Sequence, residues 1–444
     1  MKTVALILAR AGSKRILGKN TINFCGKPLL LWTIEQLKEV KEIDSIWLSS
    51  DNPVFLKMGM AAGCKPILRP IELSGSEASS ESGWEHGVRF IEKKITDVDV
   101  IIAPQVTSPV REPKDMSKAL QEFERNKYNF MCSSNAKGFQ NGSFYIFRVS
   151  TFKNLKNKKF AYFNQKITKR FIMEYWKNYE IDYLIDLKTC EVLMRHFILN
   201  DKYYETRDMN LSNSFYEENY WINSADPDGV LRNTKDELKK KLEDCKEELA
   251  YINSLPPGNI LDIGCGLGYM ISGVNSSWRK YGIDVSEWAV ERARKYCTSF
   301  KGTLEEANYR AADLFDAIIL YQSLEHIPDP IELLIKIRFI LKPGGKLILN
   351  TPNFGCDVAK RFGDNFRFLH DKGHVSLFDS LGLVRLLSDL DFRVEKVTYP
   401  YFNTVHFTEK NLMRLFDTSK VSPPSYGNLM TVYSHKKKMI LEGK

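Results

Sequence analysis

Basic residues and glycines are interspersed in the segment ARAGSKRILGKN, which directly follows an apolar run near the N-terminus. The cations are Arg10, Lys14, Arg15 and Lys19. Glycine leaves backbone amides open to a ligand, and cationic side chains neutralise phosphate oxygens. The segment therefore predicts a phosphate-binding loop, with a basic surface loop as the alternative. It is not a Walker A loop, because the spacing G-x-x-x-x-G-K-[ST] is absent.

A second glycine-rich segment, NILDIGCGLGY at 259–269, predicts a buried strand, a turn and a helix. The turn contains Gly264, Gly266 and Gly268, which would let the backbone approach a nucleotide-like ligand closely. About 20 residues downstream a short apolar run ends in Asp284, and an acid there can accept both hydroxyls of a ribose. A turn that only reverses the chain is the alternative. The missing G-x-G-x-x-G spacing argues against an NAD-binding oxidoreductase.

The segments around the basic loop alternate between predicted strands and helices. Strands are predicted at 4–9, 45–50 and 98–103, and helices at 28–40, 53–63, 79–94 and 113–127. This alternation is typical of an α/β fold with a doubly wound, mostly parallel sheet. Ligands of such sheets bind outside the carboxyl ends of the strands, where the basic loop, Asp51 and Gln105 would meet.

Ordered motifs in the first half resemble the cytidylyltransferases that activate sialic-acid-type sugars to CMP-sugars. The motifs are ARAGSKRILGKN, FCGKPLLLWTIE, LRPIELS, PQVTSPVR, NGSFYIF and IDLKT, all between Lys2 and Phe197. The SKRI variant is similar to the pseudaminic and legionaminic branches. The resemblance implies a Rossmann-type nucleotidyltransferase with CTP and a nonulosonic sugar as substrates, Mg²⁺ as cofactor, and a homodimer.

Residue by residue, this resemblance implies a nucleotide and sugar site. Arg10 and Lys19 would act in catalysis, because cations and a metal can stabilise the negative charge that builds on phosphate oxygens. The residues that would bind CTP and the sugar are Arg10, Ser13, Lys19, Asn20, Arg69, Ser80 and Gln105. Asp186 would help to hold Mg²⁺.

Two departures from the family pattern bear on activity. The family has I-D-I-D-T where this chain has IDLKT at 185–189, so Lys188 stands in place of a second metal-binding acid. Asp182 is a shifted substitute. The segment before Asn141, which helps to build the sugar site and the dimer contact in family members, is short. The domain is therefore either active with altered metal binding or degenerate and merely binding.

The second half repeats the alternation after a linker. The predicted divisions are a first domain at 1–209, a linker with a leading helix at 210–257, a second domain at 258–405 and a C-terminal extension at 406–444. The leading helix is expected at 234–255, from apolar residues spaced at threes and fours. The aromatic and acidic segment FYEENYWINSADPDG is expected to fold over the ligand of the second domain, or to be an ordinary linker.

Further elements of the second domain follow from apolar runs and turn residues. Strands are predicted at 259–263, 281–284, 317–321 and 346–350, helices at 286–296 and 331–341, and a tight turn at 342–345. A helix and then a strand at 374–397 would complete the edge of the sheet. This half is thus predicted to form a second doubly wound, mostly parallel sheet.

Four ordered motifs here resemble class I S-adenosylmethionine-dependent methyltransferases. They are LDIGCGLG, GIDVSEWAVERAR, LEHIPDP and LKPGGKLILNTPN, within a resemblance that runs from about Tyr216 to Tyr401. The implied cofactor is S-adenosylmethionine, and the implied cofactor-binding residues are Asp262, Gly264, Gly266, Gly268, Asp284 and Gln322. The glycines would pass close to the methionine part, and Asp284 would take the ribose hydroxyls.

Histidines are the candidates for a catalytic base of methyl transfer. A base is needed only where the acceptor is an alcohol or a similar poorly ionised group. His326 is nearest to the cofactor motifs by sequence, with His370 and His374 as rivals. In the alternative interpretation, Glu325 and His326 fix the loop through local hydrogen bonds.

The composition limits the cellular compartments and the classes of partner that are expected for this protein. The 444 residues carry a formal charge of +9, and the basic run at 435–438 is interpreted as a solvated tail. No apolar run reaches the roughly 18 residues of a membrane span, and the apolar patch near the N-terminus is too short for a signal peptide. Eight dispersed cysteines without a C-x-x-C pair argue against a disulfide scaffold and a zinc site, so a cytoplasmic, reducing compartment is expected. Nucleic acid is not predicted as a partner, because no basic stripe is interleaved with aromatic residues.

Two hypotheses of function remain. In the first, the protein is a bifunctional sugar-modifying enzyme that activates a nonulosonic acid to a CMP-sugar and methylates that sugar or a glycan intermediate. In the second, a degenerate first domain only recruits a CMP-sugar or a partner to the methyltransferase. Lys188 is the residue that favours the second hypothesis.

Overall fold

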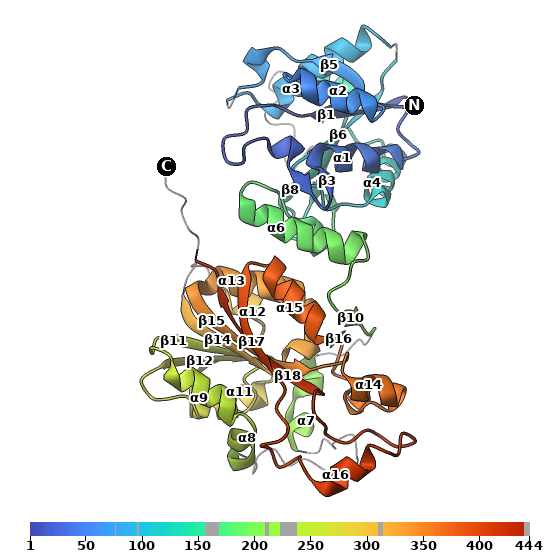
Figure 1. Cartoon of the computed structure of the whole chain (residues 1–444). Helices are drawn as coiled ribbons and strands as arrows, with labels where there is room; N and C mark the ends of the chain where they lie inside the picture. The colour runs from blue at the N-terminus through green and yellow to red at the C-terminus, as the bar shows by residue number, and fades with distance from the viewer. Residues whose placement is uncertain are drawn as a thin grey trace. The chain divides into compact units, whose positions relative to one another are not determined.

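The computed structural model describes residues 1–75, 77–95, 97–155, 168–208, 213–222, 238–309 and 314–438. The chain divides into two compact units, Met1–Asp201 and Lys202–Lys444. The main sheet of each unit has seven strands and is flanked by helices (Figure 1). The domain boundary predicted near Asn210 lies outside the described residues.

The sheet of the first unit has the strand order β5-β4-β1-β6-β8-β7-β9. Its strands are β1 (Thr3–Leu8), β4 (Ser45–Ser50), β5 (Lys65–Leu68), β6 (Val100–Pro104), β7 (Phe130–Ser134), β8 (Gln140–Arg148) and β9 (Thr168–Ile172). Among them only β8 runs antiparallel to its neighbours. The continuous apolar run of β1 is almost wholly buried, as expected for a strand covered on both faces. The prediction of a mostly parallel α/β sheet is confirmed.

Helices pack on both faces of this sheet. They are α1 (Leu29–Lys38), α2 (Pro53–Ala61), α3 (Ser80–Glu92), α4 (Pro113–Arg125), α5 (Val149–Asn154) and α6 (Leu184–Leu193). Gly59 of α2 lies against Leu48, whereas Gly87 of α3 lies against Leu6. Leu6 pairs with Trp47, so Leu6 and Leu48 point to opposite faces of the sheet. The helices predicted in this half are present and slightly shorter than expected.

The sheet of the second unit has the order β13-β12-β11-β14-β15-β18-β17. Its strands are β11 (Asn259–Ile263), β12 (Arg279–Asp284), β13 (Thr298–Lys301), β14 (Phe315–Tyr321), β15 (Leu341–Pro352), β17 (Phe392–Thr398) and β18 (Leu429–Lys436). The longer helices around it include α9 (Lys246–Ser254), α11 (Glu287–Ala293), α13 (Pro330–Ile340) and α15 (Ser380–Asp389). The parallel pairings among β11, β12, β14 and β15 match the predicted alternation, β13 was not predicted, and β17 forms the predicted edge.

Strand β18 departs from the sequence-based expectation. It inserts between β15 and β17 and pairs antiparallel with both, so part of the predicted extension belongs to the sheet. The interpretation of 435–438 as a solvated tail is wrong for His435 and Lys436, which lie in this strand. Lys436 Nζ donates to the carbonyl of Leu341 at 2.7 Å. The physical reason is that an exposed edge of β15 leaves backbone groups unpaired, and β18 supplies their partners.

Two shorter elements also differ from expectation. The leading helix, described from residue 238, is divided into α8 (Leu238–Asp244) and α9, because Cys245 has φ −105° and ψ 18° and leaves the helical region. Leu242 and Leu249, one from each segment, still pack together against Gly273. The tight turn predicted at 342–345 lies within β15, where the pairing with β14 shifts register.

Candidate active sites

A cavity of about 310 Å³ lies in the first unit beside the loops that follow β1 and β6. The seven residues predicted to bind CTP and the sugar all line it: Arg10, Ser13, Lys19, Asn20, Arg69, Ser80 and Gln105. They come from four separate segments of the chain, which meet at the carboxyl ends of parallel strands. Their roles as ligands of CTP stay predictions, but the fold brings them to one place.

Local hydrogen bonds hold the basic loop in shape. The side-chain amide of Asn20 donates to the carbonyl of Arg10 at 2.9 Å, and the backbone amide of Ala11 donates to Asp51 Oδ1 at 2.9 Å. Gly18 has a φ of 63°, a left-handed conformation that glycine adopts at little cost. The loop therefore doubles back so that both of its ends reach the cavity.

Lys19 and Arg69 are cations in the wall of this cavity, and both are largely buried. Lys19 Nζ donates to the carbonyl of Ile181 at 2.7 Å and lies 3.2 Å from Asp182 Oδ1. Arg69 is 5% exposed, and its Nε donates to Ser74 Oγ at 2.9 Å. Burial lowers the pKa of the Arg69 guanidinium. These cations are held in place before any anion binds, which favours a phosphate ligand.

Two acids, Glu180 and Asp182, also line the cavity. Burial raises the pKa of Glu180, although the hydroxyl of Thr107 donates to its Oε1 at 2.9 Å. Burial acts to raise the pKa of Asp182 as well, but Lys19 and Arg15 outweigh it and lower that pKa overall. Sequence reasoning missed Glu180. Its signal was the segment EID, in which two acids flank one apolar residue.

Asp186, predicted to hold Mg²⁺, is not among the residues that line the cavity. Its Oδ2 accepts hydrogen bonds from the backbone amides of Asp182 at 3.0 Å and Tyr183 at 2.7 Å, so it caps the N-terminus of α6. Lys188, on the same helix, is not in the lining either. The part of Asp186 in metal binding stays a prediction, and the geometry favours Asp182, the shifted substitute.

Gly142 of the NGSFYIF motif allows two cavity residues to approach β8. It has a φ of 70°, and a Cβ there would lie 2.7 Å from Gln105 Oε1 and 3.3 Å from Glu180 Oε2. Any larger residue would displace Gln105 and strain the backbone. The motif was identified from the sequence, which did not predict that its glycine lets Gln105 and Glu180 approach β8.

In the second unit, the glycine turn joins β11 to α10 (Tyr269–Ser272) as predicted. Gly264, Gly266 and Gly268 have φ values of 73°, 51° and 78°. A Cβ on Gly264 would lie 2.5 Å from Cβ of Ser323, and one on Gly266 would lie 2.6 Å from the ring of Trp221. Both conformation and close packing therefore require glycine here.

Two cavities border this turn. One, of about 210 Å³, is lined by Asp262, Gly264, Gly266 and Gln322, and the other, of about 330 Å³, by Gly264, Asp284 and Gln322. Gly268 is the one predicted cofactor residue outside both linings, because it begins α10 and packs on Ala293. Gln322 has a φ of 54°, unusual for a residue with a side chain and frequent at functional sites.

Buried carboxylates surround the glycine turn. Asp262 is 1% exposed, and burial, together with the neighbouring Asp284, raises its pKa to about 7. Its Oδ2 accepts no hydrogen bond from the described residues. Asp284 accepts the backbone amides of Gly266 at 2.8 Å and Ser286 at 2.9 Å, while burial raises its pKa. An unsatisfied, buried oxygen in a cavity wall indicates a position for a donor or a cation of a ligand.

The aromatic segment, described over 213–222, lies against the turn. Trp221, whose ring meets Gly266, donates from Nε1 to the carbonyl of Tyr216 at 2.8 Å. Glu217 accepts the backbone amide of Trp288 at 3.4 Å and so joins the segment to the start of α11. Tyr216, Tyr220 and Trp221 line the 330 Å³ cavity, and whether the segment covers a ligand stays a prediction. The end of the predicted segment, 223–229, lies outside the described residues.

Of the three histidines weighed as a base, His326 and His374 line the 210 Å³ cavity, whereas His370 is exposed and does not. The hydroxyl of Tyr216 lies 3.3 Å from His326 Nδ1. Glu325 is fully buried, which raises its pKa to about 8, and its Oε2 accepts from Thr351 Oγ1 at 2.9 Å. These hydrogen bonds fit the interpretation that Glu325 and His326 fix the loop, and a base role for His326 stays a prediction.

Family models match both units. One, described as a cytidylyltransferase, matches residues 4–248, more than half of the chain. The chain belongs to the cytidylyltransferase family. A second model, described as a methyltransferase domain, matches residues 232–397. Both resemblances inferred from the motifs are confirmed, and the chain joins a cytidylyltransferase domain to a methyltransferase domain.

Characterised relatives are similar to part of the chain. Pseudaminic acid cytidylyltransferase of Campylobacter jejuni is 32% identical over 132 residues, 30% of this chain and 57% of that protein. N-acylneuraminate cytidylyltransferase A of Danio rerio is 34% identical over 129 residues, 29% of each protein. The match thus spans less than two thirds of these relatives.

Solved structures of both kinds are also similar. A CMP-2-keto-3-deoxy-manno-octonic acid synthetase complexed with CTP is 18% identical, with 44% of this chain and 98% of that chain covered and a TM-score of 0.36. A SAM-dependent methyltransferase of Thermotoga maritima is 22% identical, with 45% and 89% covered and a TM-score of 0.32.

Free thiols and the absence of a spanning helix complete the description. All eight cysteines lie in the described residues and are free. Within the same residues no helix has both the length and the apolar character needed to cross a membrane.

Proposed function

We propose that the chain is a bifunctional sugar-modifying enzyme. The first unit would transfer CMP from CTP to a nonulosonic acid, and the second would transfer a methyl group from S-adenosylmethionine to a sugar or glycan intermediate. The observation that carries the proposal is that seven residues predicted to bind CTP and sugar line one cavity of a cytidylyltransferase-family unit.

In the first unit, the cations match the charge of a nucleoside triphosphate. The oxygen of a sugar hydroxyl would bond to the α-phosphorus while its proton passes to water, the bond from the α-phosphorus to the bridging oxygen breaks, and pyrophosphate leaves. Lys19 and Arg10 stabilise the negative charge that develops on the phosphate oxygens. Arg10 is held at the cavity by a hydrogen bond of 2.8 Å to the carbonyl of Gly75.

Mg²⁺ fits the carboxylates of this cavity, since Glu180 and Asp182 line it and carboxylate oxygens are preferred Mg²⁺ ligands. Asp182 Oδ2 lies 2.8 Å from Arg15, and Oδ1 lies 3.2 Å from Lys19. Metal binding by Asp182 therefore requires these cations to turn toward the triphosphate. The ion would supply charge neutralisation for the leaving pyrophosphate.

In the second unit, the residues fit S-adenosylmethionine in shape and charge. Asp284, at the end of β12, is placed to accept ribose hydroxyls, and the unsatisfied Oδ2 of Asp262 suits the positively charged methionine part. When bound, the cofactor would supply a methyl group on a cationic sulfur, and the site would have to align the acceptor with that methyl. Trp221 packs on Gly266 and helps to exclude water from the site.

The proposal is tested by incubating the full chain with CTP, Mg²⁺ and a panel of nonulosonic acids while pyrophosphate is measured. We expect release with at least one acid and none without a sugar. The methyl acceptor is sought by mass spectrometry of surface glycans made with and without the chain, where the loss of one O- or N-methyl group is expected. If none of the acids on the panel gives pyrophosphate release, the proposed cytidylyltransferase activity is contradicted.

A second candidate is a methyltransferase whose first unit only binds a CMP-sugar or a partner. It is favoured by the ion pairs of Asp182, which already neutralise the acid that Mg²⁺ would need. Calorimetry with CTP, run beside the turnover assay, separates the two functions. Binding without pyrophosphate release supports a binding module, and binding with release excludes it.

A further inference from the structure

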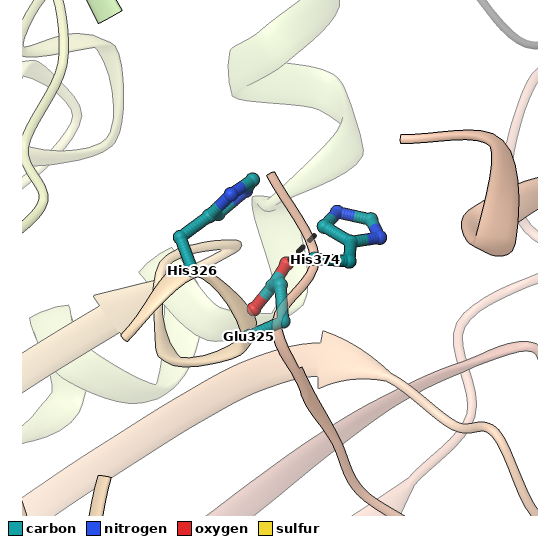
Figure 2. A group of neighbouring side chains, drawn as sticks. All are labelled: Glu325, His326 and His374. Atoms are coloured by element: carbon teal, nitrogen blue, oxygen red, sulfur yellow. Dashed lines mark ion pairs between the residues drawn. The ribbon is translucent and has the colours of Figure 1, made fainter. Parts of the chain in front are cut away.

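Glu325, His326 and His374 form a cluster in the second unit, and its two histidines line the 210 Å³ cavity (Figure 2). Glu325 and His326 belong to the 3-10 helix Leu324–His326, directly after β14, and His374 precedes the short strand β16 (Ser376–Leu377). One donor atom of each side chain lies within 4.8 Å of the other two. Figure 2 shows Glu325 and His326 on one segment and His374 on another, with an ion pair between Glu325 and His374.

His374 is held as a metal ligand would be. Its Nδ1 lies 2.8 Å from the carbonyl oxygen of Phe368, and since a carbonyl only accepts, Nδ1 must carry the proton. In the neutral ring, Nε2 then has the lone pair. This nitrogen is 4.0 Å from Glu325 Oε1 and 3.7 Å from Asp371 Oδ2. A backbone carbonyl that fixes the far nitrogen is the usual support of a metal-binding histidine.

Glu325 presents an oxygen to the same point. The residue is 0% exposed, and its Oε2 accepts from Thr351 Oγ1 at 2.9 Å. Its Oε1 accepts no hydrogen bond from any described residue. A buried carboxylate oxygen that accepts no hydrogen bond is costly, so the arrangement favours a positive charge between Glu325 and His374.

His326 completes the set of donors. Its ring centroid lies 4.8 Å from that of His374, and it lines both cavities of the second unit. Ligands about 2.1 Å from one ion in a tetrahedral arrangement lie about 3.4 Å apart, so these donor atoms, now within 4.8 Å of one another, must approach by up to about 1.4 Å. Asp371, at the edge of the cluster, adds a second carboxylate that lines the cavity.

We propose that Glu325, His326 and His374 bind one divalent transition-metal cation. Two imidazoles and one carboxylate suit Zn²⁺, Fe²⁺, Co²⁺ or Mn²⁺ and leave coordination positions open. The two histidines line the cavity that also contains Gly264 and Gly266, so an acceptor in that cavity would have access to the cation. No cysteine belongs to this site, which is why the spacing of cysteines does not reveal it.

Its role in methyl transfer rests on the function proposed above. The cation binds the hydroxyl oxygen of a sugar acceptor and makes that hydroxyl more acidic. The O–H bond breaks and its proton passes to water. The oxygen then bonds to the methyl carbon while the bond from carbon to sulfur breaks, and that electron pair stays on sulfur.

The rival explanation is a protonated His374 that pairs with Glu325 and Asp371 and binds no metal. The full chain, treated with a chelator and dialysed, is titrated with Zn²⁺ by calorimetry and with Co²⁺ by visible absorption. We expect one tight site per chain and a Co²⁺ spectrum of nitrogen and oxygen ligands. If neither ion binds, the protonated pair is the correct explanation and the proposal is overturned.

Variants locate the site within the chain. Glu325→Gln and His374→Gln should each weaken Zn²⁺ binding by more than about 100-fold, since loss of even an outer partner costs about 10- to 100-fold. His370→Gln, an exposed histidine of the same loop region, is the matched control and should bind as the wild type does. Affinity for S-adenosylhomocysteine, measured on every variant, reports whether the second unit is folded. Unchanged Zn²⁺ binding in the folded Glu325 and His374 variants would overturn the proposal.

Failure of this proposal and failure of the proposed function are distinguishable. Cation binding is measured without CTP, sugar or methyl acceptor. A tight cation that His374→Gln removes, in a chain that methylates no sugar, would leave the site standing and contradict the methyl transfer. Sugar methylation at full rate by a chelator-treated chain would contradict the role of the cation.

Discussion

Each unit places a glycine-containing loop after a buried parallel strand, β1 in the first and β11 in the second. The first loop brings Arg10 and Lys19 to its cavity, whereas the second lies among the carboxylates of Asp262 and Asp284. Similar sheets thus present opposite charges at equivalent places. The topology decides where a ligand binds, and the side chains decide its charge: in the proposed function, a polyanionic triphosphate in one unit and a cationic sulfonium in the other.

The two sites also differ in how their charges are satisfied. Lys19 already has protein partners, the carbonyl of Ile181 and the carboxylate of Asp182. Asp262, by contrast, keeps an oxygen without a hydrogen bond from the described residues, and burial raises its pKa to about 7. The cations of the first site must exchange partners to bind an anion, while Asp262 of the second site needs a proton or a cationic ligand to neutralise its charge.

The largest expected effect is the loss of CTP turnover when the positive charge of Lys19 in the first loop is removed. Lys19→Met should lower kcat/KM for CTP turnover by about 100- to 1000-fold, the usual cost of removing one group that stabilises developing charge. Calorimetry should show unchanged affinity for S-adenosylmethionine. Lys153→Met, which removes an exposed lysine paired with Glu92, is the control and should behave as the wild type does. If the Lys19 variant also lost affinity for S-adenosylmethionine, the claim that the two loops serve different ligands would be contradicted.

Backbone shape is tested by Gly266→Ala. The new Cβ would lie 2.6 Å from the Trp221 ring, so cofactor affinity should fall at least about tenfold, or about 1.4 kcal/mol. Gly363→Ala is the matched control, because Gly363 has a similar φ of 52° and nothing within 4 Å of a Cβ. It should lose stability, because a residue with a side chain is strained at φ 52° and ψ −126°, but it should bind the cofactor normally. Equal losses of affinity in both variants would mean that strain, and not the close packing, matters.

Asp262→Asn tests the carboxylate by its dependence on pH. The folded pKa of about 7 exceeds the ordinary 3.8, so between these values the folded protein keeps a proton that the unfolded chain has lost. The unfolding free energy of the wild type should therefore fall relative to that of the variant as pH rises from about 4 to 7, and the difference should be constant above pH 7.

The same ionisation should control cofactor affinity. A cationic ligand favours the ionised carboxylate, so wild-type affinity should rise a few-fold between about pH 6 and 8. Calorimetry at several pH values should show no such rise in the Asn variant. A wild-type affinity independent of pH would show that Asp262 does not meet the positive part of the ligand.

The smallest expected effect concerns the metal of the first unit. Lys188→Asp restores the acid of the family pattern, yet Lys188 does not line the cavity, so Mg²⁺-dependent pyrophosphate release should stay within about twofold of wild type. In Asp182→Asn, by contrast, added Mg²⁺ should stimulate pyrophosphate release much less than it does in the wild type. A large increase in Mg²⁺-dependent pyrophosphate release by Lys188→Asp would indicate that Asp186, and not Asp182, binds the metal.

Residues that lie near one another in sequence made much of both sites predictable. Arg10, Ser13, Lys19 and Asn20 belong to one loop, and Gly264 and Gly266 to one turn, so their proximity needs no tertiary information. Motifs at strand ends added Gln105 and Asp284, because parallel strands bring their carboxyl ends to one edge. The assignment of Asp186 was less secure, since a shift of four residues along IDYLID exchanges a cap for a cavity acid.

The sequence by itself determined the two α/β units, their glycine loops and the opposite charges of their sites, because apolar periodicity, glycine conformation and phosphate chemistry are local properties. Only the tertiary structure decided the insertion of β18, the approach of Glu180 to Gly142, and the meeting of Glu325 with His374. These contacts join distant segments, and which of them form depends on burial and backbone pairing over the whole unit.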